Sequence, residues 1–415
     1  MTSNLLKKEK MQLSTKVQSI PEALSIYINQ IVYDLKRKGY NITALSLGEA
    51  YFDIPMYDFK KLDVEKCYHY SESQGYLPLR EKLCEFYKNY YNSQINPQKE
   101  ILISAGSKPI IFMAMQAVLN QGDEGLIHEP AWLSYQEQLR LVGADAKFIP
   151  YDCPPKDFYK YFTDKTKMLI INNPNNPAGW LYTKEDLQII YEQCRPRGIY
   201  ILVDEAYSDF ICEDEQFYSM ANIVPDKDGI IIINSLSKNM GMSGLRVGYV
   251  ISSQEVIEQI LKLNQHLITC ASTIILHYLT RYFDKIIKTT MPQVKDLINK
   301  RQLVKNEMDK LKINYLKGNN TFYFFINIEN FPSSSLDFAL YLLLKYNIAV
   351  VPGSAYGKST ERFIRVSIGT ESLDRIHDSL MIIKNIITLK EFNKNELEQM
   401  LNKYNIKPFV NERGY

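Results

Sequence analysis

The stretch GIIIINSLSKNMGMSGLRVGYVIS, residues 229–252, contains two apolar runs joined by a polar, glycine-rich segment. The first run, from Ile230 to Ile233, is wholly aliphatic, which is typical of a strand that is buried on both faces of a sheet. Ser235 and Lys238 follow this run, and Arg246 precedes the second run. Because ligands of open α/β sheets bind at the carboxyl ends of the strands, the stretch predicts a buried sheet with a polar site at its edge.

Strands and helices alternate along the chain on both sides of this stretch. The strand candidates are EILISAG, EGLIHEP, AKFIPYD, KMLIINNP, IYILVDEAY, GIIIINSLS and RVGYVIS. We expect helices between them at 110–120, 133–142, 184–193 and 253–282. This alternation predicts an α/β fold with a large three-layer domain around a mostly parallel seven-stranded sheet.

The pattern changes after Met291 and indicates a smaller α+β domain. A charged helix is expected at 294–311, followed by the strands TFYFFINIE, IAVVPG and FIRVSIG among further helices. An amphipathic helix spans Leu24 to Leu35, and NITALSLGEA reads as a short strand that ends at Gly48. We therefore expect a large domain at 51–290 and a small domain in which 1–50 packs with 291–415. The polar, helical tail from Lys390 onward has no assigned role.

Composition excludes several classes of protein. The 415 residues carry 49 basic and 47 acidic side chains, so no charged surface for nucleic acid or membrane is expected. The first ten residues lack the apolar run of a signal peptide, and the six cysteines form no CxxC pair, which favours a cytoplasmic protein with reduced thiols. The five histidines form no HxxxH pair, and no metal site is predicted.

Polar and aromatic side chains gather where the predicted strands end. These residues are Ser107, Trp132, Asn176, Asp204, Tyr207, Ser235 and Lys238. Ser107 precedes a predicted helix, whose N-terminus offers free backbone N–H groups and suits a phosphate group. Ser235 and Arg246 are placed to complete such an anion site.

Each of these residues also has an ordinary structural interpretation when it is taken alone. Ser107 suits a helix cap and Asn176 a turn, while Asp204 could simply end a strand and Trp132 could fill a core. A lysine that extends from the surface into solvent is the corresponding alternative for Lys238. The site hypothesis depends on their occurring together.

The combination resembles one family, the class I/II aminotransferases of fold type I, which depend on pyridoxal 5′-phosphate. The resemblance runs from about Ser25 to Ile368 and is nearest to the aspartate/prephenate-like subgroup. The matching stretches are LSLGEAYFDIP, YHYSESQGYLPLRE, SAGSK, HEPAWLSY, NNPNNPAG, VDEAYSDF, SLSKNMGMSGLRVGY, VVPGSAYG and RFIRVSIG. Their order and spacing make the match specific, although each stretch alone is weak.

The resemblance implies a role in cofactor binding for each strand-end residue. Lys238 matches the lysine that holds the cofactor as a Schiff base and moves the proton from the substrate α-carbon. Asp204 matches the carboxylate at the pyridine nitrogen, and Tyr207 and Asn176 match the donors to the ring hydroxyl oxygen. Trp132 matches the aromatic residue stacked on the ring. The residues expected at the phosphate end are Ser107, Lys108, Ser235, Ser237 and Arg246.

Other matches concern the substrate and a second subunit. Arg365 matches the arginine that binds the substrate α-carboxylate, and Gly48 matches a backbone contact to the same group, whereas Arg362 is expected to be a solvated charge. Tyr70 matches a tyrosine that reaches the cofactor phosphate of a neighbouring subunit, which implies a homodimer with shared sites. Thr269 falls where the family contributes a small hydroxyl across that interface.

Some positions differ from the pattern of the family. Gln265 stands where one group of aspartate aminotransferases places an arginine for the side-chain carboxylate of the substrate. Lys108 stands where another group, acting on aspartate or prephenate, places a lysine, although it also fits an exposed residue of a first helical turn. Ala178 replaces the usual threonine of NPTG, and we expect this change to be mild.

We therefore expect an aminotransferase that moves an amino group between an L-amino acid and a 2-oxo acid. One alternative is another pyridoxal phosphate reaction on the same scaffold, such as β-elimination, cyclisation or oxidation of an amino acid, because the cofactor residues serve them all. A second alternative is a cofactor-binding regulatory module. We do not expect the DNA-binding helix-turn-helix that such regulators carry, because only roughly 20 residues precede the first expected helix.

Overall fold

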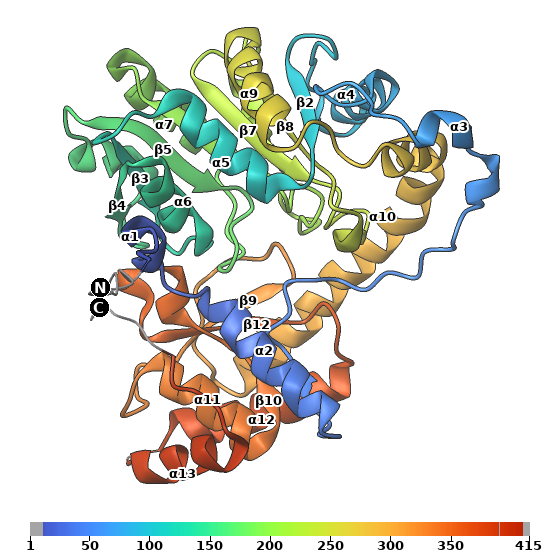
Figure 1. The fold of residues 1–415 in the computed structure, drawn as a ribbon. Coiled ribbons are helices and arrows are strands. Elements are labelled where there is room, and N and C mark those ends of the chain that lie inside the picture. Colours follow the sequence, from blue (N-terminus) through green and yellow to red (C-terminus); the bar gives the residue numbers. More distant parts are fainter. Residues whose placement is uncertain (1–10, 390, 410–415) are drawn as a thin grey trace, which may run out of the picture.

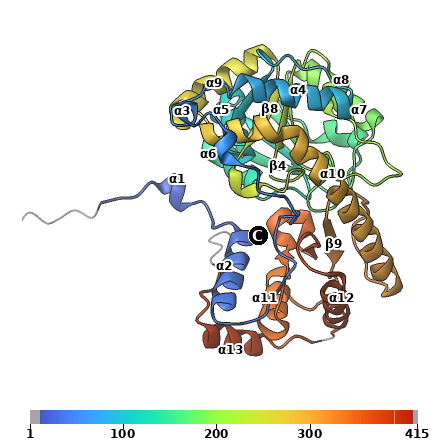
Figure 2. The same cartoon turned by 90° about the vertical axis from the view of Figure 1, so that its right-hand side faces the viewer.

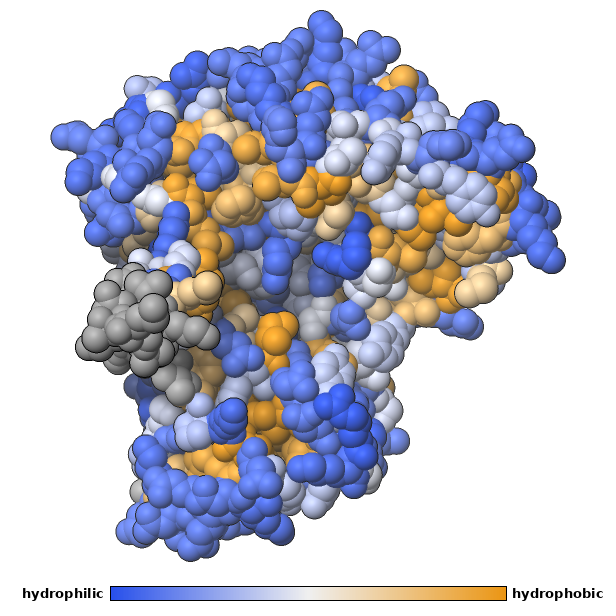
Figure 3. Space-filling model, in the orientation of Figure 1, coloured by the Kyte–Doolittle hydropathy of each residue, from blue (hydrophilic) through white to orange (hydrophobic). Residues whose placement is uncertain are grey.

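The computed structural model describes residues 11–389 and 391–409, and these form two parts. In Figure 1 the upper part is built around a seven-stranded sheet, and the lower part around a three-stranded sheet with its helices. Figure 3 shows that the surface is hollowed between them. The first ten residues, on which the prediction of no signal peptide rests, lie outside the described ranges.

The large sheet has the strand order β2-β8-β7-β6-β5-β3-β4. Its strands are β2 (Ile101–Ser104), β3 (Glu124–His128), β4 (Asp145–Ile149), β5 (Thr166–Asn172), β6 (Tyr200–Asp204), β7 (Ile230–Ser235) and β8 (Gly248–Ser252). Strand β8 is antiparallel to both β2 and β7, whereas the other neighbouring pairs are parallel. The predicted α/β fold with a mostly parallel seven-stranded sheet is confirmed.

Helices cover both faces of this sheet. One face carries α5 (Ser107–Val118), α6 (Ser134–Val142) and α9 (Gln254–Leu267), and the other carries α4 (Leu77–Tyr91), α7 (Lys184–Cys194), α8 (Met220–Ile223) and the start of α10. The short helix α3 (Val64–Cys67) lies beside α10. In β7, Ile231 and Ile233 pack into the core on the side of α5, α6 and α9. Ile230 and Ile232 pack into the core on the opposite face, beneath α4, α7, α8 and α10. The unbroken aliphatic run therefore reflects burial on both faces.

The helices after β8 differ from the prediction. One helix was expected at 253–282 and another at 294–311, but α9 ends at Leu267, and α10 (Thr273–Lys310) is a single helix of 38 residues. Thr269 takes a left-handed conformation, with a φ of 74°, and closes α9 by donating its N–H to Asn264 O at 2.7 Å. Pro292 lies inside α10 without ending it, so the change of pattern at Met291 does not mark a helix boundary.

The lower part contains β9 (Tyr323–Asn327), β11 (Val351–Pro352) and β12 (Phe363–Ser367), with β12 in the middle and antiparallel to both neighbours. Its helices are α2 (Leu24–Arg37), α11 (Ser335–Tyr346), α12 (Leu373–Ile387) and α13 (Lys394–Tyr404). The predicted strand near Gly48 is only the two-residue β1 (Thr43–Ala44), which pairs with β10 (Ile348–Ala349).

One core joins the N-terminal segment to the C-terminal third of the chain. Ile28 of α2, Leu342 of α11 and Ile383 of α12 are all fully buried in it. The division into domains at 51–290 and at 1–50 with 291–415 stays a prediction. Helix α10 runs without a break across the boundary at residue 290.

Two structural findings concern membranes and metals. None of the helices in the described ranges has both the length and the apolar character needed to cross a membrane. Within the same ranges, no three or more His, Cys, Asp or Glu side chains cluster in a way that could hold a metal ion.

Candidate active site

The N-terminus of α5 lies against strand β8. Ser107 is the first residue of α5, and Gly106 precedes it with a φ of +95°, which favours glycine. No side chain in the described part of the chain caps this helix, so its first N–H groups are open to a ligand. A Cβ atom on Gly248 would lie 2.3 Å from Ser107 N, so only glycine lets the strand approach the helix end this closely.

Arg246 and two serines face the same helix end. Arg246 is held in the left-handed region at a φ of 56°, and its guanidinium packs so closely on Gly106 that a Cβ there would lie 2.5 Å from Nη2. Ser235 Oγ donates to Ser237 Oγ at 2.8 Å and also accepts from Ser237 N at 3.1 Å. The structure thus gathers hydroxyl groups, a guanidinium and free backbone N–H groups at one place.

Lys108 occupies the first turn of α5. Its Nζ lies 5.0 Å from the centre of the Trp132 ring. Partial burial lowers the pKa of Lys108, and the charge of Arg246 lowers it further. Much of the side chain is nevertheless exposed, so the structure leaves both interpretations of this lysine open.

Lys238 points into the interior rather than into solvent. Its Nζ donates to Gly48 O at 2.6 Å and lies 5.5 Å from the centre of the Tyr207 ring. Burial lowers the pKa of Lys238 to about 8, and the nearby charge of Arg365 acts in the same direction. Lys238 as a whole is half-buried.

Asp204 ends strand β6 and is only 8% exposed. Its carboxylate accepts a hydrogen bond from Tyr135 Oη at 2.5 Å and another from Ala206 N at 3.1 Å. Burial raises the pKa of Asp204, while these two hydrogen bonds lower it. A positively charged group beside this carboxylate would favour its ionised form.

Arg365 connects several of the predicted site residues. Its Nη1 donates to Asn176 Oδ1 at 3.3 Å and its Nη2 to Ser46 O at 2.8 Å. Asn176 Nδ2 in turn donates to Tyr207 Oη at 3.3 Å, and Tyr207 Oη lies 2.9 Å from Tyr323 Oη. The guanidinium is buried, and its Nε has no hydrogen-bond partner among the described residues. A buried cation with a free donor is suited to an anion.

Gly48 lies beside this cluster. A Cβ atom on Gly48 would meet Tyr323 Oη at 3.4 Å and Arg365 Nη2 at 4.0 Å. A larger side chain would therefore occupy the space next to the guanidinium. The carbonyl of Gly48 is already used as the acceptor for Lys238.

Three tyrosines of the site were not predicted. Tyr135 donates to Asp204, the ring of Tyr323 lies 4.6 Å from the Arg365 guanidinium, and the ring of Tyr356 lies 5.5 Å from it. Tyr135 could have been found, because it lies three residues after Trp132 in the first turn of a helix. Tyr323 comes from strand β9, and nothing in its sequence signals the contact.

The prediction that Arg362 is a solvated charge is wrong. Its side chain donates to the carbonyl oxygens of Ser333 at 2.7 Å and Glu329 at 2.6 Å, and also to that of Phe331. These carbonyl groups belong to a loop that offers them no backbone partner in a helix or strand. Arg362 therefore fixes the loop before α11 and takes no part in the site.

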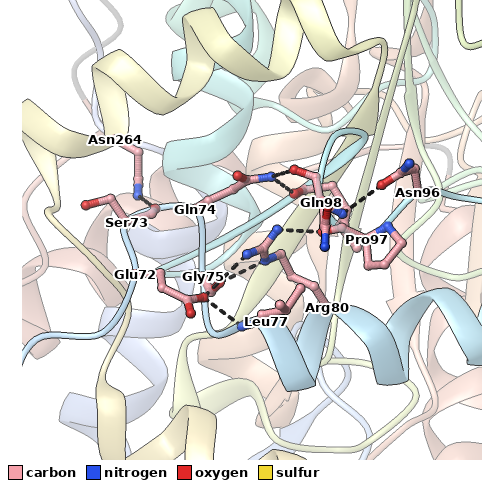
Figure 4. Close-up of polar contacts among 11 residues, drawn as sticks. Glu72, Ser73, Gln74, Gly75, Leu77, Arg80, Asn96, Pro97, Gln98 and Asn264 are labelled. Carbon is pink, nitrogen blue, oxygen red and sulfur yellow. Dashed lines mark hydrogen bonds and ion pairs between the residues drawn. The ribbon is translucent and has the colours of Figure 1, made fainter.

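Tyr70, Thr269 and Gln265 lie away from the cluster. Tyr70 is 85% exposed, and Thr269 and Gln265 are exposed as well. Hydrogen bonds hold the loop after Tyr70, as Figure 4 shows. Buried Arg80 donates to Gly75 O at 2.9 Å, and further bonds join Asn264 Nδ2 to Ser73 O at 2.6 Å and Gln74 Nε2 to Ile101 O at 2.9 Å.

Comparison with known proteins places the chain in a family. The family model described as aminotransferase class I and II matches residues 50–379. An aspartate aminotransferase of Pyrococcus abyssi is 30% identical over 367 residues, which cover 84% of this chain and 94% of that protein. A probable aspartate/prephenate aminotransferase of Aquifex aeolicus is 30% identical over 403 residues, which cover 90% of this chain and 98% of the relative.

Solved structures agree with this assignment. A protein of Methanococcus jannaschii, described as similar in its active site to kynurenine aminotransferases, superposes with a TM-score of 0.80 at 30% identity, covering 91% of this chain and 100% of that one. A Pyrococcus protein superposes with a TM-score of 0.81 at 28% identity, covering 92% and 99% of the two chains. The chain therefore belongs to the class I and II aminotransferases, enzymes of fold type I that use pyridoxal 5′-phosphate.

Proposed function

We propose that this aminotransferase works by a ping-pong mechanism in which Lys238 holds the cofactor as a Schiff base. The observation that supports this is the convergence of an amine and a guanidinium on one short backbone segment. Lys238 donates to Gly48 O and Arg365 to Ser46 O. Two residues span at most about 7 Å, so an amino acid whose carboxylate binds Arg365 has its α-carbon within reach of Lys238.

The residues present fit the cofactor. The open N-terminus of α5, together with Arg246 and Ser235, offers donors for a phosphate group, and Gly248 keeps the strand close behind them. Asp204 is a buried carboxylate that suits a protonated ring nitrogen. Further residues that would hold the cofactor are Ser107, Lys108, Trp132, Asn176, Tyr207 and Ser237, with Lys238 at the reactive carbon.

Each residue then has a defined task in the reaction. The bound cofactor supplies an electron sink for the electron pair that remains when the substrate α-carbon loses its proton. The Lys238 amine would carry that proton, and its lowered pKa suits an amine that must lose and gain a proton near neutral pH. Asp204 would favour a protonated ring nitrogen, and Arg365 would bind the substrate carboxylate.

We also infer that the active unit is a homodimer. Tyr70 is exposed, yet the loop behind it is fixed by buried Arg80 and Asn264, so the side chain is presented to a neighbour in a defined position. In such a dimer, Tyr70 would reach the cofactor phosphate of the second subunit, and Thr269 would lie near the interface. A cytoplasmic location stays a prediction.

Lys108 is our candidate for recognising a second carboxylate of the substrate. It follows Ser107 at the helix end, and Gln265, which is exposed on α9, provides no charge for that purpose. A dicarboxylic amino acid or 2-oxo acid is therefore a suitable partner in one half of the reaction. Aspartate and glutamate belong to this class, and prephenate does as an acceptor.

The test follows the absorbance of the bound cofactor while the amino acid and the 2-oxo acid are added one after the other, so that each half-reaction is observed alone. An amino acid added alone should change the absorbance spectrum of the cofactor once per site, without further turnover. Addition of 2-oxoglutarate should then restore the original spectrum. An enzyme that performs β-elimination would instead release ammonia continuously from the amino acid alone. Continuous ammonia release without an acceptor would overturn the proposal.

A further inference from the structure

The C-terminal segment after α12 folds back across the lower part of the molecule and lies beyond the region that the family model matches, which ends at residue 379. Helix α13 packs against α11. Leu397 of α13 is 2% exposed in the shared core, and Lys345 Nζ lies 2.8 Å from Glu396 Oε1. The segment is therefore an integral part of the packed structure.

After α13 the chain turns towards α2. Asn405 ends the helix in a left-handed conformation, and Tyr27 Oη donates to Lys407 O at 2.7 Å. The rings of Tyr27 and Phe409 lie 5.2 Å apart, and Phe409 is partly buried. These contacts hold Phe409 in one place beside the N-terminal segment.

Phe409 lines an apolar pocket of about 270 Å³ between the two parts of the molecule. Its other apolar walls include Ile20, Pro21, Trp132, Phe148 and Leu336. A cavity of roughly 150 Å³ with apolar walls is large enough to hold a benzene molecule, so this pocket has room for a six-membered ring or a long aliphatic chain. A larger cavity of about 790 Å³ near Tyr91 contains none of the predicted site residues.

The pocket shares two walls with the candidate active site. Trp132 lines it and also lies beneath Lys108 Nζ at 5.0 Å, and Tyr356 lines it while its ring lies 5.5 Å from the Arg365 guanidinium. A substrate whose carboxylate binds Arg365 can therefore extend its side chain past Tyr356 into the pocket. This step rests on the proposed role of Arg365.

We propose that Phe409 forms part of the binding pocket for the substrate side chain and makes the enzyme prefer an amino donor with a large apolar side chain, aromatic or long aliphatic. Three charged residues line the pocket: Glu22 and Lys358 are exposed, and Glu137, whose side chain is 17% exposed, is paired with Arg140 at 2.7 Å, while most of the other walls are apolar. Because a ping-pong enzyme binds two substrates in turn at one site, this preference is compatible with a dicarboxylic acceptor that contacts Lys108.

Binding of an unreactive analogue tests the pocket without turnover. The probe is 3-phenylpropionate, which has the carboxylate and ring of phenylalanine but no amine, and propionate is the reference. In the holoenzyme, Phe409→Ala should lower the affinity for 3-phenylpropionate, relative to the affinity for propionate, by about 10-fold. The reason is that a lost apolar contact of this size changes affinity by roughly 10- to 200-fold. Ile406→Ala is the control, because Ile406 packs on the same core but does not line the pocket.

The same variants should change substrate preference. The ratio of kcat/KM for phenylalanine to that for alanine should fall about 10-fold in Phe409→Ala and stay constant in Ile406→Ala. Both variants must show the cofactor absorbance and an unfolding temperature close to that of the parent. Phe409→Leu keeps an apolar wall and should give a ratio of kcat/KM values between those of the parent and of Phe409→Ala. If Phe409→Ala does not fold, the leucine variant still tests the proposal.

Two results would overturn the proposal. One is an unchanged ratio of affinities and of kcat/KM in Phe409→Ala, and the other is an equal fall in the Ile406→Ala control. Failure of the proposed function would look different, since no amino acid would then change the cofactor absorbance in the parent enzyme. In that case the affinity for 3-phenylpropionate would still report on the pocket.

Discussion

Lys238 differs from a solvent-exposed lysine in the pKa of its amine and in its hydrogen-bond partner. Its amine is enclosed by protein, which lowers the pKa from 10.5 to about 8, and its one hydrogen-bond acceptor among the described residues is a neutral carbonyl, Gly48 O. Burial without a carboxylate partner at hydrogen-bond distance disfavours the charged form of the amine. The residue is thereby suited to attack a carbonyl group and to carry a proton near neutral pH.

We predict that Lys238 is the residue to which the cofactor attaches. Borohydride reduction of the purified enzyme should fix the cofactor to the peptide that contains Lys238. Lys238→Ala should still bind the cofactor through the phosphate end but lose nearly all turnover, because the proton carrier is missing. Labelling of a different lysine would contradict the assignment.

The pKa of Lys238 predicts how attachment depends on pH. Only the neutral amine reacts, so the rate of cofactor attachment to the apoenzyme should rise with pH and level off above about 8. A lysine with its ordinary pKa would continue to gain rate up to about pH 10. Absorbance changes after rapid mixing of apoenzyme and cofactor between pH 6 and pH 10 distinguish the two profiles.

Lys108 should affect dicarboxylic substrates selectively. A charge-assisted hydrogen bond contributes about 1.5–3 kcal/mol, so Lys108→Ala should lower kcat/KM for aspartate by roughly 10- to 100-fold. The loss for alanine, which has no second carboxylate, should be much smaller. Equal losses for both substrates, or no loss for either, would show that Lys108 does not contact the substrate side chain.

The place of several site residues at the edge of the sheet could be predicted from the sequence, but some of their supporting contacts could not, and their chemical roles stay predictions. Lys238, Asp204 and Asn176 stand at strand ends, where the position along the chain alone places them at the edge of the sheet. Tyr323 is an ordinary core residue in the sequence, and its contact with Tyr207 arises only from tertiary packing, whereas the place of Tyr135 after Trp132 gave a signal for its bond to Asp204. For Arg362 the sequence did not reveal the loop carbonyls that surround it.

At the scale of elements, the proposed phosphate site depends on the distance between β8 and α5. The backbone of Gly248 lies against Ser107 N and the Gly106 carbonyl carbon, where an added Cβ would be 2.3 Å and 2.6 Å away. Backbone atoms cannot move aside as a flexible side chain can. A methyl group at position 248 must therefore displace the end of the helix.

We predict that Gly248→Ala weakens cofactor binding by about 10-fold or more, because the displaced N–H groups no longer face the phosphate. The control is Gly244→Ala, since the Cβ of that residue would meet nothing within 4 Å. Titration of each apoenzyme with the cofactor measures the dissociation constants. Equal affinities for the two variants would contradict this account of the helix end.

The elements themselves were predicted well where burial determines the pattern and poorly where it does not. Strand β7 is aliphatic because both of its faces are buried, so its type and place were evident from the sequence. The boundary between α9 and α10 depends on the left-handed Thr269, a residue type that rarely adopts this conformation. A proline normally ends or kinks a helix, yet α10 continues past Pro292.

At the scale of the whole molecule, apolar side chains gather on the segment that carries Tyr70. Tyr51, Met56, Tyr68 and Tyr70 are between 67% and 89% exposed. Figure 3 shows apolar side chains on this side of the molecule, around the position of α3 in Figure 1. A surface of this kind favours contact with another subunit.

We predict that the active sites are shared between two subunits. A Tyr70→Phe chain and a Lys238→Ala chain should each have little activity alone. After subunit exchange, the mixed dimer should regain one site that contains an intact Lys238 from one chain and an intact Tyr70 from the other. If exchange is verified by mass and activity does not recover, Tyr70 does not complete a neighbouring site.

The long helix α10 is one of two covalent links between the parts of the molecule. Pro292 has no N–H group, so the carbonyl of Lys288 loses its helical partner and the helix bends more easily there. The other covalent link between the parts passes Asp53, which exchanges hydrogen bonds of 2.7 Å and 3.0 Å with Gln293. Both links therefore meet at one place. Tyr207 and Phe210 of the upper part are buried in the core of the lower part, so a change of angle at this place would also disturb packing that the two parts share.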